Sequence, residues 1–158
     1  MIIEKIDKNI KLLDGEKRRI HTIELTHDDI EKRHQRLSAD SGFEIAVSLA
    51  EGEALFDGAV LYENDEEIVV VKAAKEKVII MEPRTNKEWG MLAYNIGNMH
   101  QKAFLTEKEI LVPYDHVLEG VIRKFDVPMR IEECPIFGTR ANVTAKEHAI
   151  YHEHRSLG

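Results

Sequence analysis

The spacing of apolar residues changes once along this chain, near residue 74. Before this point, the runs 19–25 and 43–49 alternate apolar and polar residues, which is typical of strands with one buried face. After it, apolar residues in two segments recur every three or four positions, as in helices that pack one side against a sheet. This change predicts two folded units, residues 1–74 and residues 75–146, followed by a tail of residues 147–158.

The first unit is expected to be a small all-β domain. Further strands are predicted at 59–62 and 67–71, joined by the acidic turn 63–66. Turns are also expected at residues 40–42, 51–52 and 57–58, where Asp, Ser and Glu stand beside glycine. The charged segment 26–36 interrupts this pattern, and its Thr-His-Asp-Asp start predicts a short helix or an ordered loop.

The second unit is expected to contain two helices in a sheet of four strands. Strands are predicted at 77–83, 103–105, 110–112 and 127–134. Thr85 and Glu88 form a capping box that starts the first helix, and Gly97-Asn98 supply the left-handed backbone at its end. Asp115 caps the second helix. The apolar stripes of the two helices are Trp89, Leu92, Ala93 and Ile96 in the first and Val117, Leu118, Val121, Ile122 and Phe125 in the second.

The resulting order β-α-β-β-α-β predicts a ferredoxin-like, split-βαβ domain with both helices on one face of an antiparallel sheet. The fold class of the whole chain is therefore expected to be α+β. With 158 residues and 43% apolar residues, the chain has enough apolar side chains for such cores.

Charge and composition exclude several classes of function. The formal net charge is −7, and all of it falls in residues 1–73, so a nucleic-acid ligand is not expected. No stretch approaches the roughly 18 apolar residues of a membrane span, and the first residues do not resemble a signal peptide. We therefore expect a cytoplasmic protein without a membrane partner. The single cysteine, Cys134, excludes a disulfide or a Cys-Cys metal motif within one chain and is expected to be a small, buried or half-buried apolar side chain.

Histidines mark the candidate functional residues. His100 follows the end of the first predicted helix, and His148, His152 and His154 lie near the C-terminus. Neutral imidazole is a good ligand for nickel, copper and zinc, so these four residues are candidate metal ligands. In a helical tail His148 and His152 would share a face, whereas His152 and His154 could chelate in an extended one. The remaining histidines, His21, His27, His34 and His116, are expected to be ordinary surface residues or, for His116, a weak alternative ligand.

Two segments and the tail together resemble one family. The helix exit Ile96-Gly97-Asn98-Met99-His100, the segment Ile110-Leu111-Val112-Pro113-Tyr114-Asp115 and the histidine-bearing C-terminus are similar to those of UreE, the urease accessory protein that delivers nickel. Family members usually carry Gly-Asn-Arg-His where this chain has Gly97-Asn98-Met99-His100, and their tails often hold longer histidine runs. The resemblance implies that His100 binds Ni(II) at a dimer interface and that tail histidines add ligands. It also implies delivery of nickel, as cargo, to the GTPase of the urease maturation complex and on to the urease apoprotein.

The chemistry of imidazole is compatible with a nickel site at His100, but it also leaves other metals and other functions open. A two-fold axis near His100 would bring two imidazoles together in a homodimer. Imidazole also binds Zn(II) and Cu(II), which are possible competitors. A metal-dependent hydrolase is disfavoured because the chain lacks a His-Glu-x-x-His motif and a nucleophile elbow, so no enzymatic activity is expected. A ferredoxin-like RNA-binding module lacks support in the strand composition and charge. A general peptide-binding or chaperone module and a zinc- or copper-binding protein without nickel delivery remain as alternatives.

Overall fold

The computed structural model describes residues 1–13 and 15–141. The chain divides into two compact units, Met1–Ala74 and Lys75–Gly158, and each is described by itself. Among the described residues, no helix has the length and apolar character required to cross a membrane.

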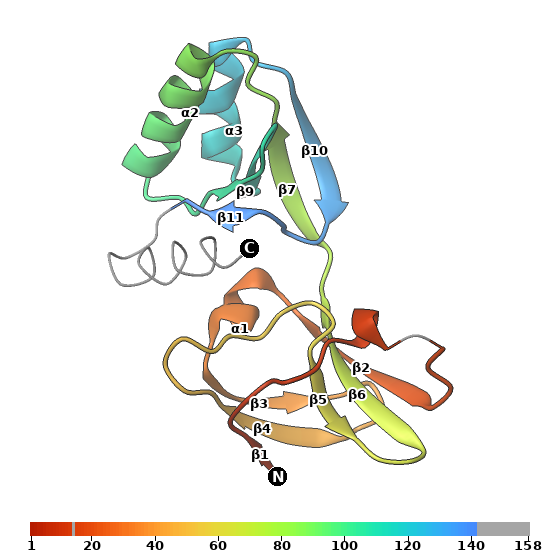
Figure 1. The fold of residues 1–158 in the computed structure, drawn as a ribbon. Coiled ribbons are helices and arrows are strands. Elements are labelled where there is room, and N and C mark those ends of the chain that lie inside the picture. Colours follow the sequence, from red (N-terminus) through yellow and green to blue (C-terminus); the bar gives the residue numbers. More distant parts are fainter. Residues whose placement is uncertain (14, 142–158) are drawn as a thin grey trace. The chain divides into compact units, whose positions relative to one another are not determined.

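The first unit contains two three-stranded sheets. One has the order β1-β4-β3 and the other the order β2-β6-β5 (Figure 1). The strands are β1 (Ile2–Ile3), β2 (Arg19–Leu25), β3 (His34–Ser38), β4 (Glu44–Ser48), β5 (Val60–Glu63) and β6 (Glu67–Ala73). A 3-10 turn, η1 (Ile10–Leu12), and a short helix, α1 (His27–Glu31), complete the unit.

Alternation along β2 explains how this unit forms its core. Ile23 and Leu25 are buried while Glu24 between them is exposed, because successive strand residues point to opposite faces. Strand β2 pairs in parallel with β6, with Ile23 opposite Val71. The two sheets contribute to one apolar cluster that includes Ile45, Val47 and Val69. The predicted strands at 19–25 and 67–71 are thus present, while β1 and β3 were not predicted.

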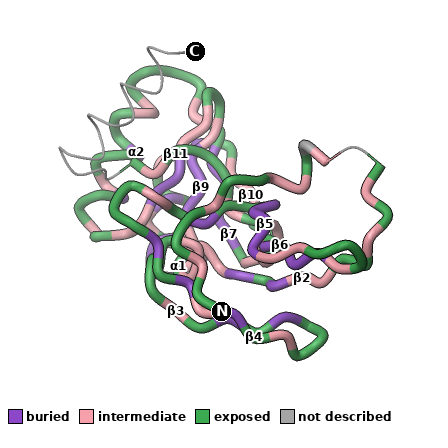
Figure 2. Tube along the Cα trace, turned by 60° about the horizontal axis from the view of Figure 1, so that its bottom comes forward, coloured by how far each residue is buried: buried purple, intermediate pink, exposed green. Residues whose placement is uncertain are grey.

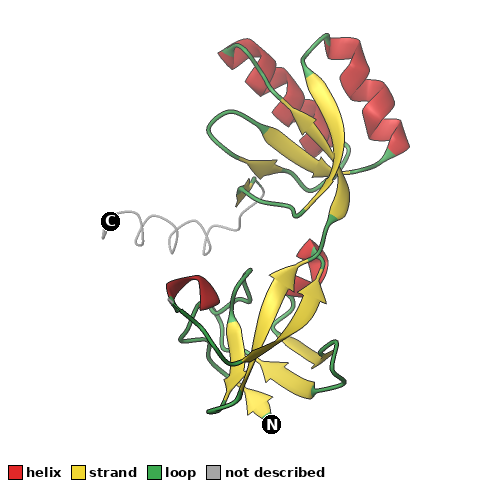
Figure 3. Ribbon diagram, turned by 90° about the vertical axis from the view of Figure 1, so that its right-hand side faces the viewer, coloured by secondary structure: helices red, strands yellow, loops and turns green. Residues whose placement is uncertain are grey.

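The second unit is a five-stranded antiparallel sheet with two helices. Its strand order is β10-β7-β9-β8-β11. The elements are β7 (Glu76–Met81), α2 (Asn86–Asn98), β8 (Phe104–Leu105), β9 (Ile110–Pro113), α3 (His116–Ile122), η2 (Arg123–Phe125), β10 (Met129–Cys134) and β11 (Thr139–Arg140). Both helices lie on the same side of this sheet (Figure 1), and the strands are seen from another direction in Figure 3.

The two faces of this sheet bury different sets of side chains. Ile79 of β7 and Val112 of β9 are cross-strand partners and belong to the cluster that receives the helix residues Leu92, Ile96, Leu118 and Ile122. On the opposite face, Val78, Ile80, Phe104 and Leu111 form a second cluster, against which Cys134 and Ile136 pack. The sheet therefore holds both helices through one face.

The helices differ in detail from the sequence expectations. In α2 only Leu92 and Ile96 are buried, as the largely exposed and intermediate tube of this helix shows in Figure 2. Ala93 is exposed, because the contact stripe follows residues 89, 92, 96 and 99 and is narrower than expected. In α3, Val117 is also exposed, because Leu118 and Ile122, one turn apart, already fill the contact with the sheet.

The predicted capping box at the start of α2 is half formed. The hydroxyl of Thr85 accepts a 3.1 Å hydrogen bond from the Glu88 amide. The carboxylate of Glu88 instead accepts a 2.6 Å hydrogen bond from the amide of Arg84 and pairs with its guanidinium. The ion pair with Arg84 thus draws this carboxylate one residue away from the expected amide.

Candidate metal centre

The backbone at the end of α2 places His100 in a left-handed conformation. Helix α2 ends at Asn98, within the predicted exit, but the left-handed backbone expected at Gly97-Asn98 falls two positions later. The positive φ angle, 55°, falls on His100. The His100 amide donates to Gly97 O at 3.0 Å, and the amide of the next residue, Gln101, donates to Ile96 O at 3.3 Å. These two bonds form a Schellman closure, whose left-handed position is usually glycine and in which histidine is among the better tolerated alternatives.

His100 is exposed between two anchored residues. Met99 packs against the core between helices and sheet, and Ala103, at the entry to β8, is buried. His100 itself is exposed to solvent. The fold therefore presents this imidazole from a backbone that is fixed on both sides, which favours a defined position for a ligand.

The helix end also supplies a favourable electrostatic environment for a cation. The last carbonyl groups of a helix carry the negative end of its dipole, and α2 has no basic residue in its last turn. The last turn before His100 therefore carries no cationic side chain that would repel a metal ion.

The other three candidate ligands, His148, His152 and His154, lie outside the described residues. The described part of the chain ends at residue 141, seven residues before His148. Strand β11 pairs with β8, and the amide of Ala141 donates a 2.8 Å hydrogen bond to the carbonyl oxygen of Ala103. Residue 141 therefore lies beside a segment that begins three residues after His100. Sequence reasoning missed β11, whose two residues show no periodicity.

Of the remaining histidines, His21, His27 and His34 belong to the first unit and His116 to the second. The side chains of His21 and His27 are each only 12% exposed, so the expectation of ordinary surface histidines is wrong for these two. His21 lies on the core-facing side of β2, and its Nε2 atom is 3.4 Å from Glu67 Oε1. His34 is exposed and lies 3.1 Å from the hydroxyl of Ser48. His116 is exposed at the start of α3.

No set of three or more His, Cys, Asp or Glu side chains is arranged to hold a metal ion within residues 1–13 and 15–141. Cys134 is half-buried, and burial, reinforced by the nearby carboxylate of Glu132, raises the pKa of its thiol. A thiol must lose its proton to bind a metal, so this environment disfavours Cys134 as a ligand. A set of three or more such ligands that includes His100 therefore needs side chains from beyond this part of the chain or from another molecule.

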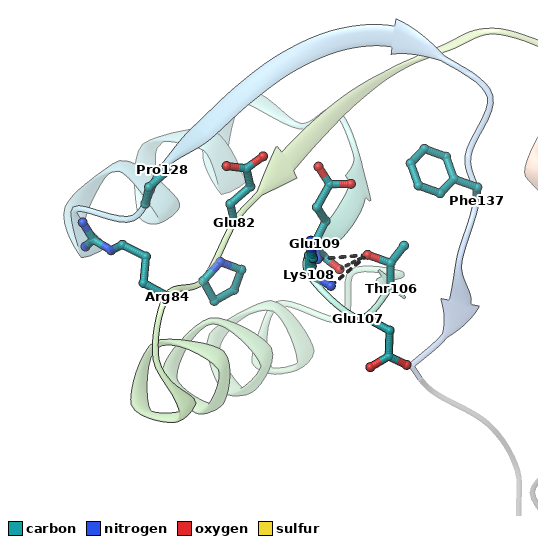
Figure 4. Close-up of a pocket in the computed structure, with 9 residues that line it drawn as sticks. Glu82, Arg84, Thr106, Glu107, Lys108, Glu109, Pro128 and Phe137 are labelled. Carbon is teal, nitrogen blue, oxygen red and sulfur yellow. Dashed lines mark hydrogen bonds between the residues drawn. The ribbon is translucent and has the colours of Figure 1, made fainter.

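A pocket of about 810 Å³ lies in the second unit (Figure 4). Its lining residues are Glu82, Pro83, Arg84, Thr106, Glu107, Lys108, Glu109, Pro128 and Phe137. It contains no histidine, and the carboxylates of Glu82 and Glu109 are bound to the guanidinium of Arg130 at 2.9 and 2.7 Å. The hydroxyl of Thr106 accepts hydrogen bonds from the amides of Lys108 and Glu109 and closes the turn between β8 and β9. This pocket does not include any of the predicted ligands.

The outer faces of α2 and α3 carry exposed apolar side chains. Tyr94 is 70% exposed and Val117 is 55% exposed. Gly90, Gly97 and Gly120 lie on the same helices, and a Cβ atom at each would have no neighbour within 4 Å. Exposed apolar side chains beside glycines allow a second backbone to approach closely.

Comparison with known proteins finds one family whose two domain models together match residues 3–157. The model of the UreE urease accessory protein, N-terminal domain, matches residues 3–74. The model of the UreE urease accessory protein, C-terminal domain, matches residues 67–157.

Individual relatives agree with this match. The chain is 38% identical over 135 residues to the urease accessory protein UreE of Bacillus cereus, which covers 84% of this chain and 89% of the relative. It is 36% identical over 135 residues to the protein of the same name from Staphylococcus carnosus, covering 84% of this chain and 90% of the relative. For Geobacillus kaustophilus the identity is 35% over 133 residues, with the same two coverages of 84% and 90%.

Proposed function

Because this chain belongs to the UreE family of urease accessory proteins, whose role lies in urease maturation, we propose that it is a homodimeric nickel metallochaperone. It binds Ni(II) as cargo and delivers it during assembly of the urease active site. It performs no catalysis of its own, and it acts in the cytoplasm without nucleic-acid or membrane partners. Its partners in delivery are the urease maturation GTPase and the urease apoprotein complex.

The observation that carries this proposal is the placement of His100. Its imidazole is exposed at a helix end, while Met99 and Ala103 on either side are held in the fold. A histidine at a positive φ angle costs stability that glycine at the same position would not cost. A strained, exposed and well-anchored imidazole is understandable as a functional group.

A dimer supplies the second imidazole. A single exposed histidine holds a transition metal weakly, whereas an isologous contact brings two copies of the same side chain together. The exposed apolar face of α2 and α3, with Tyr94 and Val117, is suited to this contact, and His100 follows directly at the end of α2. We place the two-fold axis close to this helix end.

The tail supplies further ligands. His148, His152 and His154 follow Ala141 by seven to thirteen residues, and seven extended residues span up to about 25 Å. Because Ala141 is hydrogen-bonded to Ala103, the tail histidines are within reach of His100. A site made from two fixed and several tethered imidazoles releases its ion more readily than a closed structural site, as a carrier requires.

The two units are assigned different roles. We assign residues 75–146 to metal binding and dimerisation and describe this domain as ferredoxin-like, a description supported by the order β10-β7-β9-β8 and by two helices on one face. Residues 1–74 form the partner- or peptide-binding domain, and their negative charge favours a basic partner surface. Residues 147–158 form the histidine-containing tail.

Equilibrium dialysis against Ni(II), Zn(II) and Cu(II), with the mass of the protein measured in solution, tests this function. Zinc and copper are expected to compete because imidazole binds all three ions, with copper bound most tightly. Deletion of residues 147–158 is expected to leave folding and dimerisation intact while lowering the capacity or affinity for nickel. A monomer that binds no nickel would support the alternative of a general peptide-binding module. A dimer that retains zinc or copper and rejects nickel would support a metal-binding role without nickel delivery.

A further inference from the structure

The last described strand, β11, depends on a glycine. Strand β10 lies at one edge of the second sheet and β11 at the opposite edge, beyond β8. Only residues 135–138 connect these two strands, so the connection has little slack across a sheet of this width. Ile136 packs against the apolar cluster on the sheet face opposite the helices, and Gly138 then turns the chain into β11.

Gly138 satisfies two constraints that another residue would violate. Its φ angle is +102°, a conformation that residues with a Cβ atom rarely adopt. A Cβ atom added to Gly138 would also lie 2.7 Å from the carbonyl oxygen of Leu105 and 3.0 Å from its carbonyl carbon. Both atoms belong to the backbone of β8, so this contact cannot be relieved by rotating a side chain.

The strand that follows fixes the origin of the tail. Thr139 pairs with Leu105 and Arg140 pairs with Phe104, and the amide of Ala141 donates to Ala103 O at 2.8 Å. These contacts run along β8 towards the segment that contains His100. Ala103, which accepts the last of these bonds, follows His100 by three residues in the sequence.

We propose that Gly138 is a positioning residue for the metal site, because it seats β11 against β8 and so fixes, at Ala141, the point from which the C-terminal histidines are tethered. This inference rests on the proposed nickel-binding function. A tether raises the effective concentration of the tail histidines at His100. A shift of the point from which the tail extends lowers this concentration without removing any ligand. Gly138 thus controls nickel affinity although it offers no donor atom to the metal.

Three sets of variants test this role by nickel titration of the full chain. Gly138→Ala is expected to weaken nickel binding by about tenfold or more, and by no more than deletion of residues 147–158 does. In the deletion background, Gly138→Ala is expected to have no further effect, because no tail histidine remains to be positioned. The control is Gly52→Ala in the first unit, where φ is +91° but an added Cβ would have no neighbour within 4 Å; it is expected to leave nickel affinity unchanged.

A metal-independent readout accompanies the titration. Hydrogen exchange of the Ala141 amide in the apo protein is expected to accelerate in Gly138→Ala, because its bond to Ala103 is lost or weakened. Ala141→Pro, which removes this donor without adding a side chain at Gly138, is expected to reproduce the loss of nickel affinity. This second variant keeps the test decisive if Gly138→Ala folds poorly.

The outcomes separate the positioning role from the proposed function. Wild type that binds no nickel, or whose binding is unchanged by His100→Ala, overturns the function and the inference together. A second outcome is that wild type binds nickel and the tail deletion weakens this binding, while Gly138→Ala and Ala141→Pro bind nickel as wild type does. This outcome overturns the role of Gly138 alone. An equal loss from Gly138→Ala in the presence and absence of the tail also overturns it, because Gly138 would then act on the fold and not on the tether.

Discussion

The backbone amide of His100 donates a 3.0 Å hydrogen bond to the carbonyl oxygen of Gly97, and this bond closes helix α2 with a histidine at a position that normally suits glycine. The residue that would bind nickel is therefore also a residue that strains the fold. In the proposed function the imidazole of His100 is needed for nickel binding, whereas its Cβ atom at a positive φ angle lowers the stability of the fold. Substitutions can measure these two effects separately.

Replacement of His100 by glycine is expected to stabilise the apo protein relative to replacement by alanine, by about 1 kcal/mol, because only glycine adopts a positive φ angle without a Cβ penalty. Denaturant unfolding of both apo variants measures this difference. Asp126, with φ of 50° at the end of η2, provides the control. Asp126→Gly should also be more stable than Asp126→Ala, but it should leave nickel binding unchanged. Equal stabilities of the two His100 variants would mean that the helix end adapts without strain.

The dimer is expected to depend on the exposed face of the helices. Val117→Asp places a charge at an exposed position of α3 and should produce a folded monomer that has lost the tightest nickel site, since a charge at the centre of an apolar contact is poorly tolerated. Sedimentation or light scattering measures the mass.

Ile20→Asp is the matched control for this variant. Ile20 is also an exposed apolar residue, 47% accessible, but it lies on β2 in the first unit. The control should remain dimeric. A dimeric Val117→Asp variant would move the interface away from this helix face.

Acid sensitivity of the first unit is expected to involve Glu16. Two hydrogen bonds from the Arg18 guanidinium, at 2.6 and 2.8 Å, hold the pKa of Glu16 at about 2, below the ordinary value of 4.5. Because the folded-state pKa is depressed, the stabilising effect of this pair is complete above about pH 4.5 and is lost as the pH falls towards and through 2.

Unfolding of wild type and Glu16→Gln across this pH range measures the effect. The two proteins should converge in stability as the pH falls, and the difference should be largest above pH 4.5. Glu44→Gln, which removes an exposed carboxylate from β4, controls for the loss of one charge. A constant difference between wild type and Glu16→Gln at every pH would exclude titration of this carboxylate as the cause.

The local rules of sequence reasoning account for much of the fold. Thr85 and Asp115 are the caps that the sequence predicts: each accepts a hydrogen bond from an amide three residues later, because a capping side chain acts through contacts only a few residues away. Strand β2 has the predicted limits, because its alternation of buried and exposed residues reflects a single sheet face.

Features that depend on distant contacts could not be predicted in this way. Strands β1 and β11 have two residues each, too few for a periodicity, and they exist because distant strand edges accept them. The left-handed residue after α2 is His100 and not Gly97 or Asn98, because Met99 still packs on the core. His100 was predictable as a candidate ligand from its place after the helix, but its positive φ angle and the neighbouring position of Ala141 required the structure.

Nickel affinity is expected to fall steeply as the pH decreases from about 7.5 to about 5.5. Free histidine titrates near pH 6.5, and a ligand nitrogen must be unprotonated, so protons and nickel compete for the same atoms. Proton uptake measured in buffers of different ionisation enthalpy should exceed one per ion released. Affinity that is constant over this range would assign the metal to carboxylates.

We infer that two copies of His100 form the tightest nickel site of a dimer. Calorimetric titration of wild type and His100→Gly with nickel examines this site, because glycine removes the imidazole and retains the backbone conformation of the helix end. We expect one tightly bound ion per wild-type dimer, loss of this tight site in the variant, and an apo variant at least as stable as apo wild type. Unchanged tight binding in His100→Gly would show that His100 is not a ligand of the tightest site.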